Sequence, residues 1–272
     1  MATSFVPPGG PLELLFEAPE LPSCDLGTAL STAYGGGKLG FAEPALIANF
    51  VSSLDGVVGL PSTSESGGII SQNSSADRFV MGLLRALADV VVVGASTFRR
   101  TPRHRWHADA VCPSAAQAYA ELRARLGLAV KPLFVLVTAS GDFETNSPAL
   151  EHALIATTRE GESRLRGRVP AGCRLVAFEQ ARVDVREVVA LLRGEGARLI
   201  LTEGGPALFG EIVARGLLDD LFLTASPNLF GRYASDRRKA LTEGVDLAGL
   251  PLQLSSVRRH GSHLFLRYSR SK

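Results

Sequence analysis

The chain has 272 residues, of which 46% are hydrophobic and 21% charged, so its composition is that of a soluble globular protein and excludes a disordered or fibrous one. Lys and Arg number 29 against 27 acidic residues, and this balance gives no general electrostatic reason to expect a nucleic acid or an anionic membrane as a partner. Cys24, Cys112 and Cys173 form no CxxC pair, which predicts neither a disulfide framework nor a zinc site.

The N-terminal 44 residues are rich in Pro, Gly and Leu without clear periodicity, and we expect an irregular arm over residues 1–44 followed by one domain over 45–272. They show no basic segment ahead of an apolar stretch, and no apolar run approaches the roughly 18 residues of a transmembrane helix. A cytoplasmic location is therefore expected.

Short apolar, β-branched runs begin at Ala45 and are typical of strands buried on both faces. They cover residues 45–53, 89–96, 133–140, 152–158, 173–179, 198–205, 220–227 and 263–269. Helical patterns lie between several of them, over residues 75–88, 114–126, 184–193 and 206–215. This alternation predicts an α/β fold with parallel strands and helices on both faces of the sheet.

The end of the chain has a different pattern. Residues 252–257 and 263–269 flank a short segment that contains Gly261, and they predict an antiparallel hairpin at the edge of the sheet. The expected sheet is therefore mixed, mostly parallel, with an antiparallel C-terminal edge.

The segment Thr202-Glu203-Gly204-Gly205-Pro206 joins an expected strand to an expected helix. Glycines at such a junction let a ligand approach the backbone, and the helix N-terminus offers free N–H groups to an anion such as phosphate. The Glu203 carboxylate would point into the same crevice. The alternative is an ordinary turn between a strand and a helix.

A second junction of the same kind follows the strand at 89–96, where Gly94 precedes Ser96 and Thr97. Hydroxyl groups and arginines at a strand end suit phosphate binding, and the arginines that follow are Arg99, Arg100, Arg103 and Arg105. A solvated basic loop with a helix cap is the alternative. Two such junctions in one sheet fit a dinucleotide better than a mononucleotide.

The first strand ends in Ser52-Ser53-Leu54-Asp55-Gly56, which leads into a Gly- and Ser-rich loop of the kind that covers a ligand. By itself an Asp-Gly pair after a strand is more often a turn. The GxGxxG, P-loop, GxSxG, HExxH and zinc-deaminase signatures are absent. His104 and His107 lie among arginines without a third ligand, so no metal is expected.

Three segments together resemble the pyrimidine reductase family of riboflavin biosynthesis: SSLDG at 52–56, DRFVMGLLRALADVVVVGAST at 77–97 and LTEGGPALFGEIVARGLLDDLFLTASPNLFG at 201–231. The resemblance covers about residues 45–269, and the chain also resembles the stand-alone actinobacterial members, in which no deaminase domain precedes the reductase. It implies a dihydrofolate-reductase-like fold.

The resemblance also implies an activity: NADPH-dependent reduction of 5-amino-6-(5-phosphoribosylamino)uracil to its ribitylamino form, with hydride transfer to C1′ of the ribose. The positions that match the family's cofactor contacts are Val51, Gly94, Thr97, Thr138 or Ala139, Gly204, Gly205, Ala207 and Leu208. Ser96, Arg99 and Arg100 lie where the 2′-phosphate is expected, which predicts NADPH rather than NADH.

On the substrate side, Arg85 and Glu203 match substrate-contacting positions, and Glu203 is also a catalytic candidate. Asp55 matches an aspartate near the reacting centre, and our hypothesis is that it binds substrate and acts as proton donor or orienting group. The family commonly forms homodimers, and the expected edge strand at 263–269 offers a surface for pairing.

The segment 97–106 departs from the family pattern, because Arg100 and Thr101 replace acidic residues and the arginine that meets the substrate phosphate has no certain counterpart. Arg103 or Arg105 could take over this phosphate. Otherwise, the chain could be an NADPH reductase of the same fold that acts on a dihydropterin, a dihydrofolate-like compound or another imine or carbonyl. A nucleotide-binding protein without catalysis is the third alternative.

Overall fold

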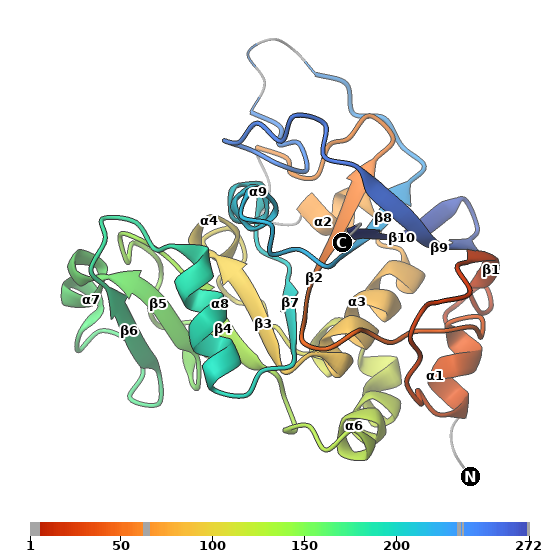
Figure 1. The fold of residues 1–272 in the computed structure, drawn as a ribbon, viewed down its shortest axis with the longest axis horizontal. Helices are drawn as coiled ribbons and strands as arrows, with labels where there is room; N and C mark the ends of the chain where they lie inside the picture. Colours follow the sequence, from red (N-terminus) through yellow and green to blue (C-terminus); the bar gives the residue numbers. More distant parts are fainter. Residues whose placement is uncertain (1–5, 62–65, 233–234, 236, 271–272) are drawn as a thin grey trace.

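A computed structural model describes residues 6–61, 66–232, 235 and 237–270, and within them ten strands form one sheet (Figure 1). In spatial order the strands are β1 (Glu13–Glu17), β9 (Leu252–His260), β10 (His263–Arg270), β8 (Asp220–Ser226), β2 (Ala45–Ser53), β7 (Leu199–Thr202), β3 (Val90–Gly94), β4 (Leu133–Val137), β5 (Leu154–Thr158) and β6 (Arg174–Phe178). Neighbours from β8 to β6 pair in parallel, and those from β1 to β8 pair antiparallel. The predicted mixed, mostly parallel sheet is confirmed.

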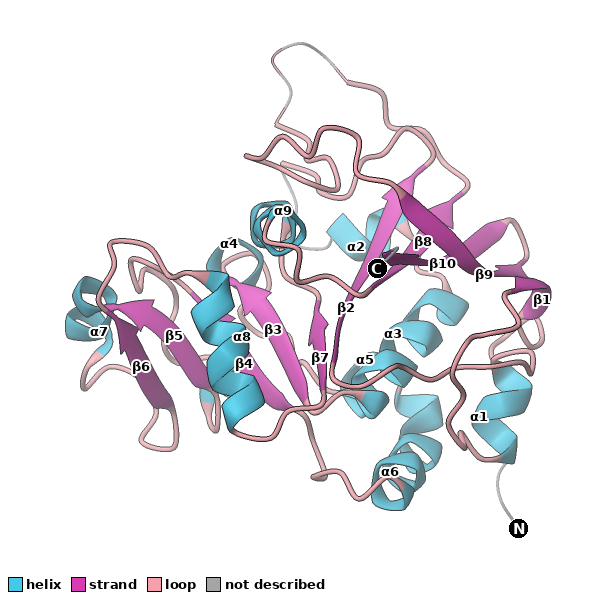
Figure 2. Ribbon diagram, in the orientation of Figure 1, coloured by secondary structure: helices cyan, strands magenta, loops and turns pink. Residues whose placement is uncertain are grey.

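Helices cover both faces of this sheet, as predicted (Figure 2). In chain order the α-helices are α1 (Thr28–Ala33), α2 (Ser66–Ile70), α3 (Ser75–Leu87), α4 (Ala95–Phe98), α5 (Ala108–Val111), α6 (Ala116–Arg125), α7 (Arg159–Leu165), α8 (Val185–Gly194) and α9 (Pro206–Ala214), with 3-10 turns at Pro113–Ala115 and Pro148–Leu150. Figure 2 shows α8 and α9 on one face and α1, α3 and α6 on the other.

The strand β3 shows why its sequence is an uninterrupted apolar run. All five of its residues are buried, and its alternate side chains enter two different hydrophobic cores. Val91 and Val93 pack with α3, while Val90 and Val92 pack with α8 and α9. A strand buried on both faces needs no polar alternation.

The N-terminal arm is more regular than predicted, because it contains β1 and α1. The strand β1 pairs with β9, and Leu12, Leu30 and Leu39 are each 1% exposed in the core. β1 was missed since an isolated five-residue segment, ELLFE, has no alternation, and its partner lies more than 230 residues further along the chain. The division of the chain at residue 44 stays a prediction.

The predicted C-terminal hairpin is confirmed, with Gly261 in the turn at a positive φ of 58°. However, the strand at 263–269 does not form the outer edge of the sheet. As β10 it lies between β9 and β8, and β1 is the outermost strand on this side. The expectation that this strand offers a free pairing surface is therefore wrong, because the N-terminal arm adds β1 beyond the hairpin.

The topology brings the sequence motifs to one edge of the sheet. β2, β7, β3 and β8 all run in the same direction, so their carboxyl ends meet there, and β7 separates β2 from β3. In open α/β sheets, ligands bind outside the carboxyl ends of strands at such a switch in strand order.

Candidate active site

The two predicted glycine junctions lie side by side at this edge. The Gly205 N–H, at the start of α9, donates a hydrogen bond to Thr97 Oγ1 in α4 at 2.8 Å. A Cβ atom at Gly204 would lie 2.7 Å from the Gly94 nitrogen, which is too close for any side chain. The glycines therefore let the β3–α4 and β7–α9 junctions approach each other at backbone distance.

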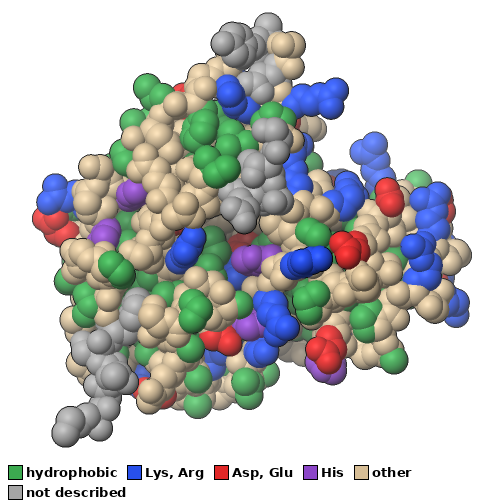
Figure 3. All heavy atoms as spheres, turned by 180° about the vertical axis from the view of Figure 1, so that it is seen from behind, with side chains coloured by type: hydrophobic (Ala, Val, Ile, Leu, Met, Phe, Trp, Pro, Cys, Tyr) green, Lys and Arg blue, Asp and Glu red, His purple; other side chains and the backbone are tan. Residues whose placement is uncertain are grey.

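A cavity of about 630 Å³ opens beside these junctions, within the size range of small-molecule sites. Eight of the residues predicted for the site line it: Val51, Arg85, Ser96, Thr97, Arg99, Arg100, Glu203 and Gly205. On the face seen in Figure 3, Lys, Arg and His side chains gather near the middle of the molecule. The structure thus brings predicted residues from β2, α3, α4 and the start of α9 together around one cavity.

Other predicted cofactor residues lie outside the cavity lining. Thr138 is buried, and its Oγ1 accepts a hydrogen bond from the Gly141 N–H at 3.1 Å. Ala207 lies exposed on α9, and Leu208 packs beside Gly94. Gly94 and Gly204 are buried at the ends of their strands. Their contact with a cofactor stays a prediction.

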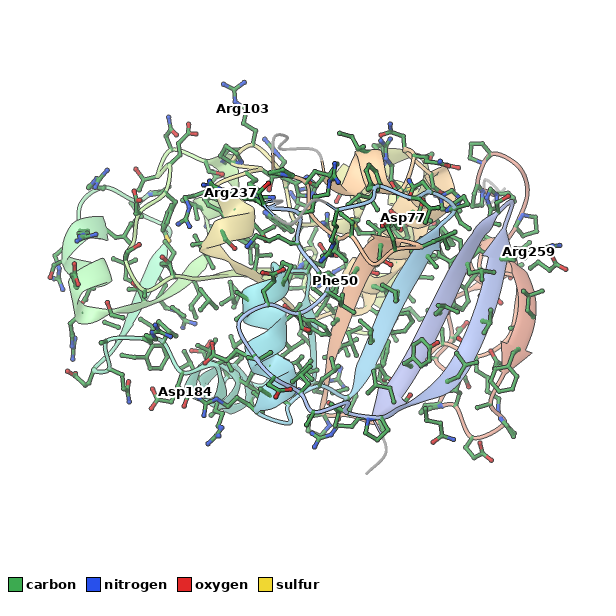
Figure 4. All side chains as sticks on the ribbon, turned by 90° about the horizontal axis from the view of Figure 1, so that it is seen from above. Phe50, Asp77, Arg103, Asp184, Arg237 and Arg259 are labelled. Atoms are coloured by element: carbon green, nitrogen blue, oxygen red, sulfur yellow. The ribbon has the colours of Figure 1, made fainter. Side chains whose placement is uncertain are left out.

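Arg103 and Arg105, the candidates for the substrate phosphate, are both exposed and do not line the cavity. Figure 4 shows Arg103 extending away from the protein. The main chain of Arg105 turns inward, because its carbonyl accepts a hydrogen bond from Arg85 Nη1 at 3.3 Å. The structure gives neither side chain a contact with the site, and their binding of phosphate stays a prediction.

Arg85 and Glu203 form a buried ion pair at the base of the cavity. Their side chains are 1% and 6% exposed, and Arg85 Nη2 lies 2.6 Å from a Glu203 oxygen while Nε lies 3.0 and 3.1 Å from the two oxygens. The segment after α4 supplies the other acceptors: the carbonyls of Arg105 and His107 and the ring of His104. All five N–H groups of the guanidinium are therefore occupied within the protein.

His104 lies in the cavity lining as a neutral acceptor. Burial, reinforced by the positive charge of Arg85, lowers its pKa to about 3. Because arginine can only donate, the 3.1 Å contact from Arg85 Nη2 fixes Nε2 of His104 as the acceptor. Trp106 supports this arrangement by stacking on Phe134 with ring centroids 5.7 Å apart.

Asp55 lies at the end of β2 but does not line the cavity. Its carboxylate accepts hydrogen bonds from the Ser53 hydroxyl and from the N–H groups of Phe230 and Gly231, the latter at 2.6 Å. The hydrogen bond from Ser53 is the main reason that its pKa lies below the usual value. This geometry suits an ionised carboxylate that holds the loop after β8. Contact between Asp55 and the substrate stays a prediction.

Three charged residues of the lining were not predicted from the sequence: Asp77, Arg78 and Lys239. Asp77 and Arg78 lie in the first turn of α3. They belong to the segment 77–97, but its sequence does not show that their side chains face the cavity. Lys239 comes from a distant loop, which an isolated bridge to Gly59 holds at the cavity. The lining thus holds the cations Arg78, Arg99, Arg100 and Lys239 besides Arg85, against the acids Asp77 and Glu203. This excess of positive charge suits an anionic ligand.

Among the described residues, no group of three or more His, Cys, Asp or Glu side chains is arranged to hold a metal ion. Within the same residues, no helix combines the length and the apolar character that crossing a bilayer requires.

A model of the RibD C-terminal domain family matches residues 44–266. A pyrimidine reductase-like protein of Corynebacterium diphtheriae has a similar structure, with 22% identity and a TM-score of 0.70 over 84% of this chain and 92% of that one. RibD of Acinetobacter baumannii follows with 18% identity and a TM-score of 0.63 over 91% of this chain and 62% of that one. Riboflavin biosynthesis reductase Rib7 of Saccharomyces cerevisiae has 12% identity and a TM-score of 0.57 over 86% and 93%. No curated protein sequence matches the chain.

Proposed function

The chain belongs to the RibD C-terminal domain family, and we propose that it is an NADPH-dependent oxidoreductase of riboflavin biosynthesis. It reduces 5-amino-6-(5-phosphoribosylamino)uracil to the ribitylamino form. The observation that carries this proposal is the single cavity in which the β3–α4 and β7–α9 junctions meet the buried Arg85–Glu203 pair. One side offers backbone and hydroxyl groups to a nucleotide, and the other offers fixed polar groups to a substrate.

The residues at the two junctions fit a nicotinamide dinucleotide. A Cβ at Gly205 would lie 2.7 Å from Thr97 Oγ1 and 3.1 Å from Ser96 Oγ, so the bare backbone leaves the hydroxyls of α4 accessible to a ligand. Ser96, Arg99 and Arg100 line the same part of the cavity and supply donors for a 2′-phosphate. When bound, NADPH supplies a hydride. The side chains of Ser96, Arg99 and Arg100 orient the bound cofactor and favour NADPH over NADH.

Purified protein tests this proposal through NADPH oxidation, with the phosphoribosylaminopyrimidine and dihydrofolate offered in parallel. We expect turnover with the pyrimidine alone, and NADPH binding at least tenfold tighter than NADH binding in a fluorescence titration. Equal affinity for the two nucleotides would contradict the role of Ser96, Arg99 and Arg100. Turnover of dihydrofolate alone would contradict the substrate.

The contacts of Arg85 favour a second candidate, an NADPH reductase of the same fold with another imine or carbonyl substrate. Since all five N–H groups of Arg85 are occupied within the protein, this side chain has none left for a substrate. Besides Glu203, the acceptors are His104, Arg105 and His107, at the end of the segment that departs from the family pattern. The parallel assay separates the two candidates.

We also propose that the protein is cytoplasmic. We propose further that it forms a homodimer through β1, since this strand is an outer edge of the sheet. Leu14, Leu15 and Phe16 are 38%, 49% and 44% exposed there, and an exposed apolar edge invites pairing. In light scattering after size exclusion, we expect a dimer that Leu15→Lys converts to a monomer. Val130→Lys, at a loop residue that is 86% exposed, is the control. A monomeric wild-type protein would exclude this assembly.

A further inference from the structure

Asp77 is a buried acid of the cavity that the proposed function has not yet used. It lies in the first turn of α3, where its N–H donates to the capping hydroxyl of Ser74 at 3.2 Å. Asp77 is only 5% exposed, yet it is part of the cavity lining. Figure 4 shows it close to β2 and β8, the strands that lead to the switch in strand order.

The groups that face the Asp77 carboxyl come from three directions. Thr224 of β8, itself 2% exposed, forms a hydrogen bond with it, Glu203 at the end of β7 repels its negative charge, and Arg78 on α3 attracts it. Burial is the largest influence and, with the repulsion from Glu203, raises the pKa of Asp77 to about 6, although the hydrogen bond to Thr224 and the charge of Arg78 lower it. Asp77 can therefore hold a proton near neutral pH, unlike an ordinary aspartic acid.

The other titratable groups near the site are less suited to donate a proton. Glu203 is already paired with the guanidinium of Arg85, whose Nη2 lies 2.6 Å from one of its oxygens. His104 is neutral and uses Nε2 to accept a hydrogen bond from Arg85. Asp55 lies outside the lining, and its carboxylate already accepts three N–H or O–H groups. Of the two described acids of the lining, Glu203 is paired with Arg85, whereas Asp77 has a hydrogen bond to the hydroxyl of Thr224.

We propose that Asp77 is the general acid of the reduction, a role that rests on the proposed function. As the C1′–O4′ bond of the ribose opens, the nitrogen lone pair forms a C1′=N bond and O4′ takes the proton of Asp77 to become the 4′-hydroxyl. The hydride that NADPH supplies then adds to C1′, and the π electrons return to nitrogen. Asp77 regains a proton from water, so one hydride and one proton are consumed in each turnover.

The test compares wild-type protein with Asp77→Asn, which keeps the size and the hydrogen bond to Thr224, and with Asp77→Glu. Glu151→Gln, at an exposed acid outside the lining, is the matched control. We expect Asp77→Asn to lower kcat at least 100-fold, with the Kd of NADPH changed less than twofold, and Asp77→Glu to restore part of the rate. Above pH 6 the wild-type rate should fall with rising pH, whereas the residual rate of Asp77→Asn should not.

A second readout does not depend on turnover. In infrared difference spectra between wild type and Asp77→Asn, the carbonyl band of a protonated carboxyl should disappear as the pH rises through about 6. A kcat within threefold of wild type, or an effect on KM alone, overturns the role of Asp77 while leaving the function intact. Wild-type protein that binds NADPH but does not turn over the pyrimidine overturns the function and, with it, this role.

Discussion

Replacement of Arg85 by methionine is expected to lower the free energy of unfolding by about 3–5 kcal/mol, because removal of one partner leaves an uncompensated charge in the interior. The remaining charge is Glu203, whose side chain is only 6% exposed. The change also removes the donors that hold the carbonyls of Arg105 and His107 and the ring of His104. We therefore expect the cavity wall to loosen and turnover to be lost together with stability.

Urea denaturation measures this effect, and two further variants make it specific. Arg164→Met removes the arginine of an exposed pair with Glu160 on α7, and it should cost no more than about 1 kcal/mol. Combining Arg85→Met with Glu203→Leu removes both buried charges, and it should recover part of the lost stability but not turnover. If Arg85→Met unfolds at the same urea concentration as wild type, the pair contributes nothing to the fold.

The core of the fold was predictable because its signals are local. β3 has the sequence Val-Val-Val-Val-Gly, and burial on both faces demands such a run wherever the strand lies in the sheet. The cap of α3 was equally local, since Ser74 accepts from an N–H three residues away. β1 was not predictable, because Glu13 and Glu17 are held by Arg259 and Arg258 from the far end of the chain.

The candidate site divides in the same way. Glycines and hydroxyls at Gly94, Thr97 and Gly205 mark strand–helix junctions in the sequence itself, so their place at one edge followed from the parallel sheet. Glu203 was placed in the crevice by its position before two glycines, and Arg85 was assigned to the site through the family resemblance. That they bind each other depends on residues 118 positions apart, and no pattern in the sequence records it. Lys239 was missed for the same reason.

Gly204→Ala is expected to be the most damaging single-methyl change at the candidate cofactor site. The new Cβ would lie 2.7 Å from the Gly94 nitrogen and 3.0 Å from Val93 Cα. Both atoms belong to the backbone at the buried end of β3, which cannot move without disturbing its pairing with β4 and β7. Overpacking of this kind costs about 1–3 kcal/mol, and we expect NADPH binding to weaken at least tenfold, because the two junctions must separate.

Two other glycines test whether this cost comes from the clash. At Gly205 an added Cβ would meet only the hydroxyls of Thr97 and Ser96, which can rotate away, so Gly205→Ala should cost less stability than Gly204→Ala. At Gly194, the exposed last residue of α8, a Cβ meets nothing within 4 Å, and alanine should be neutral or slightly stabilising. Thermal unfolding should therefore rank the variants Gly204→Ala, Gly205→Ala and Gly194→Ala from lowest to highest Tm. A Gly204→Ala protein as stable as Gly194→Ala would mean that β3 and β7 tolerate a wider junction. Close contact between the two backbones would then not determine the shape of the cofactor side of the cavity.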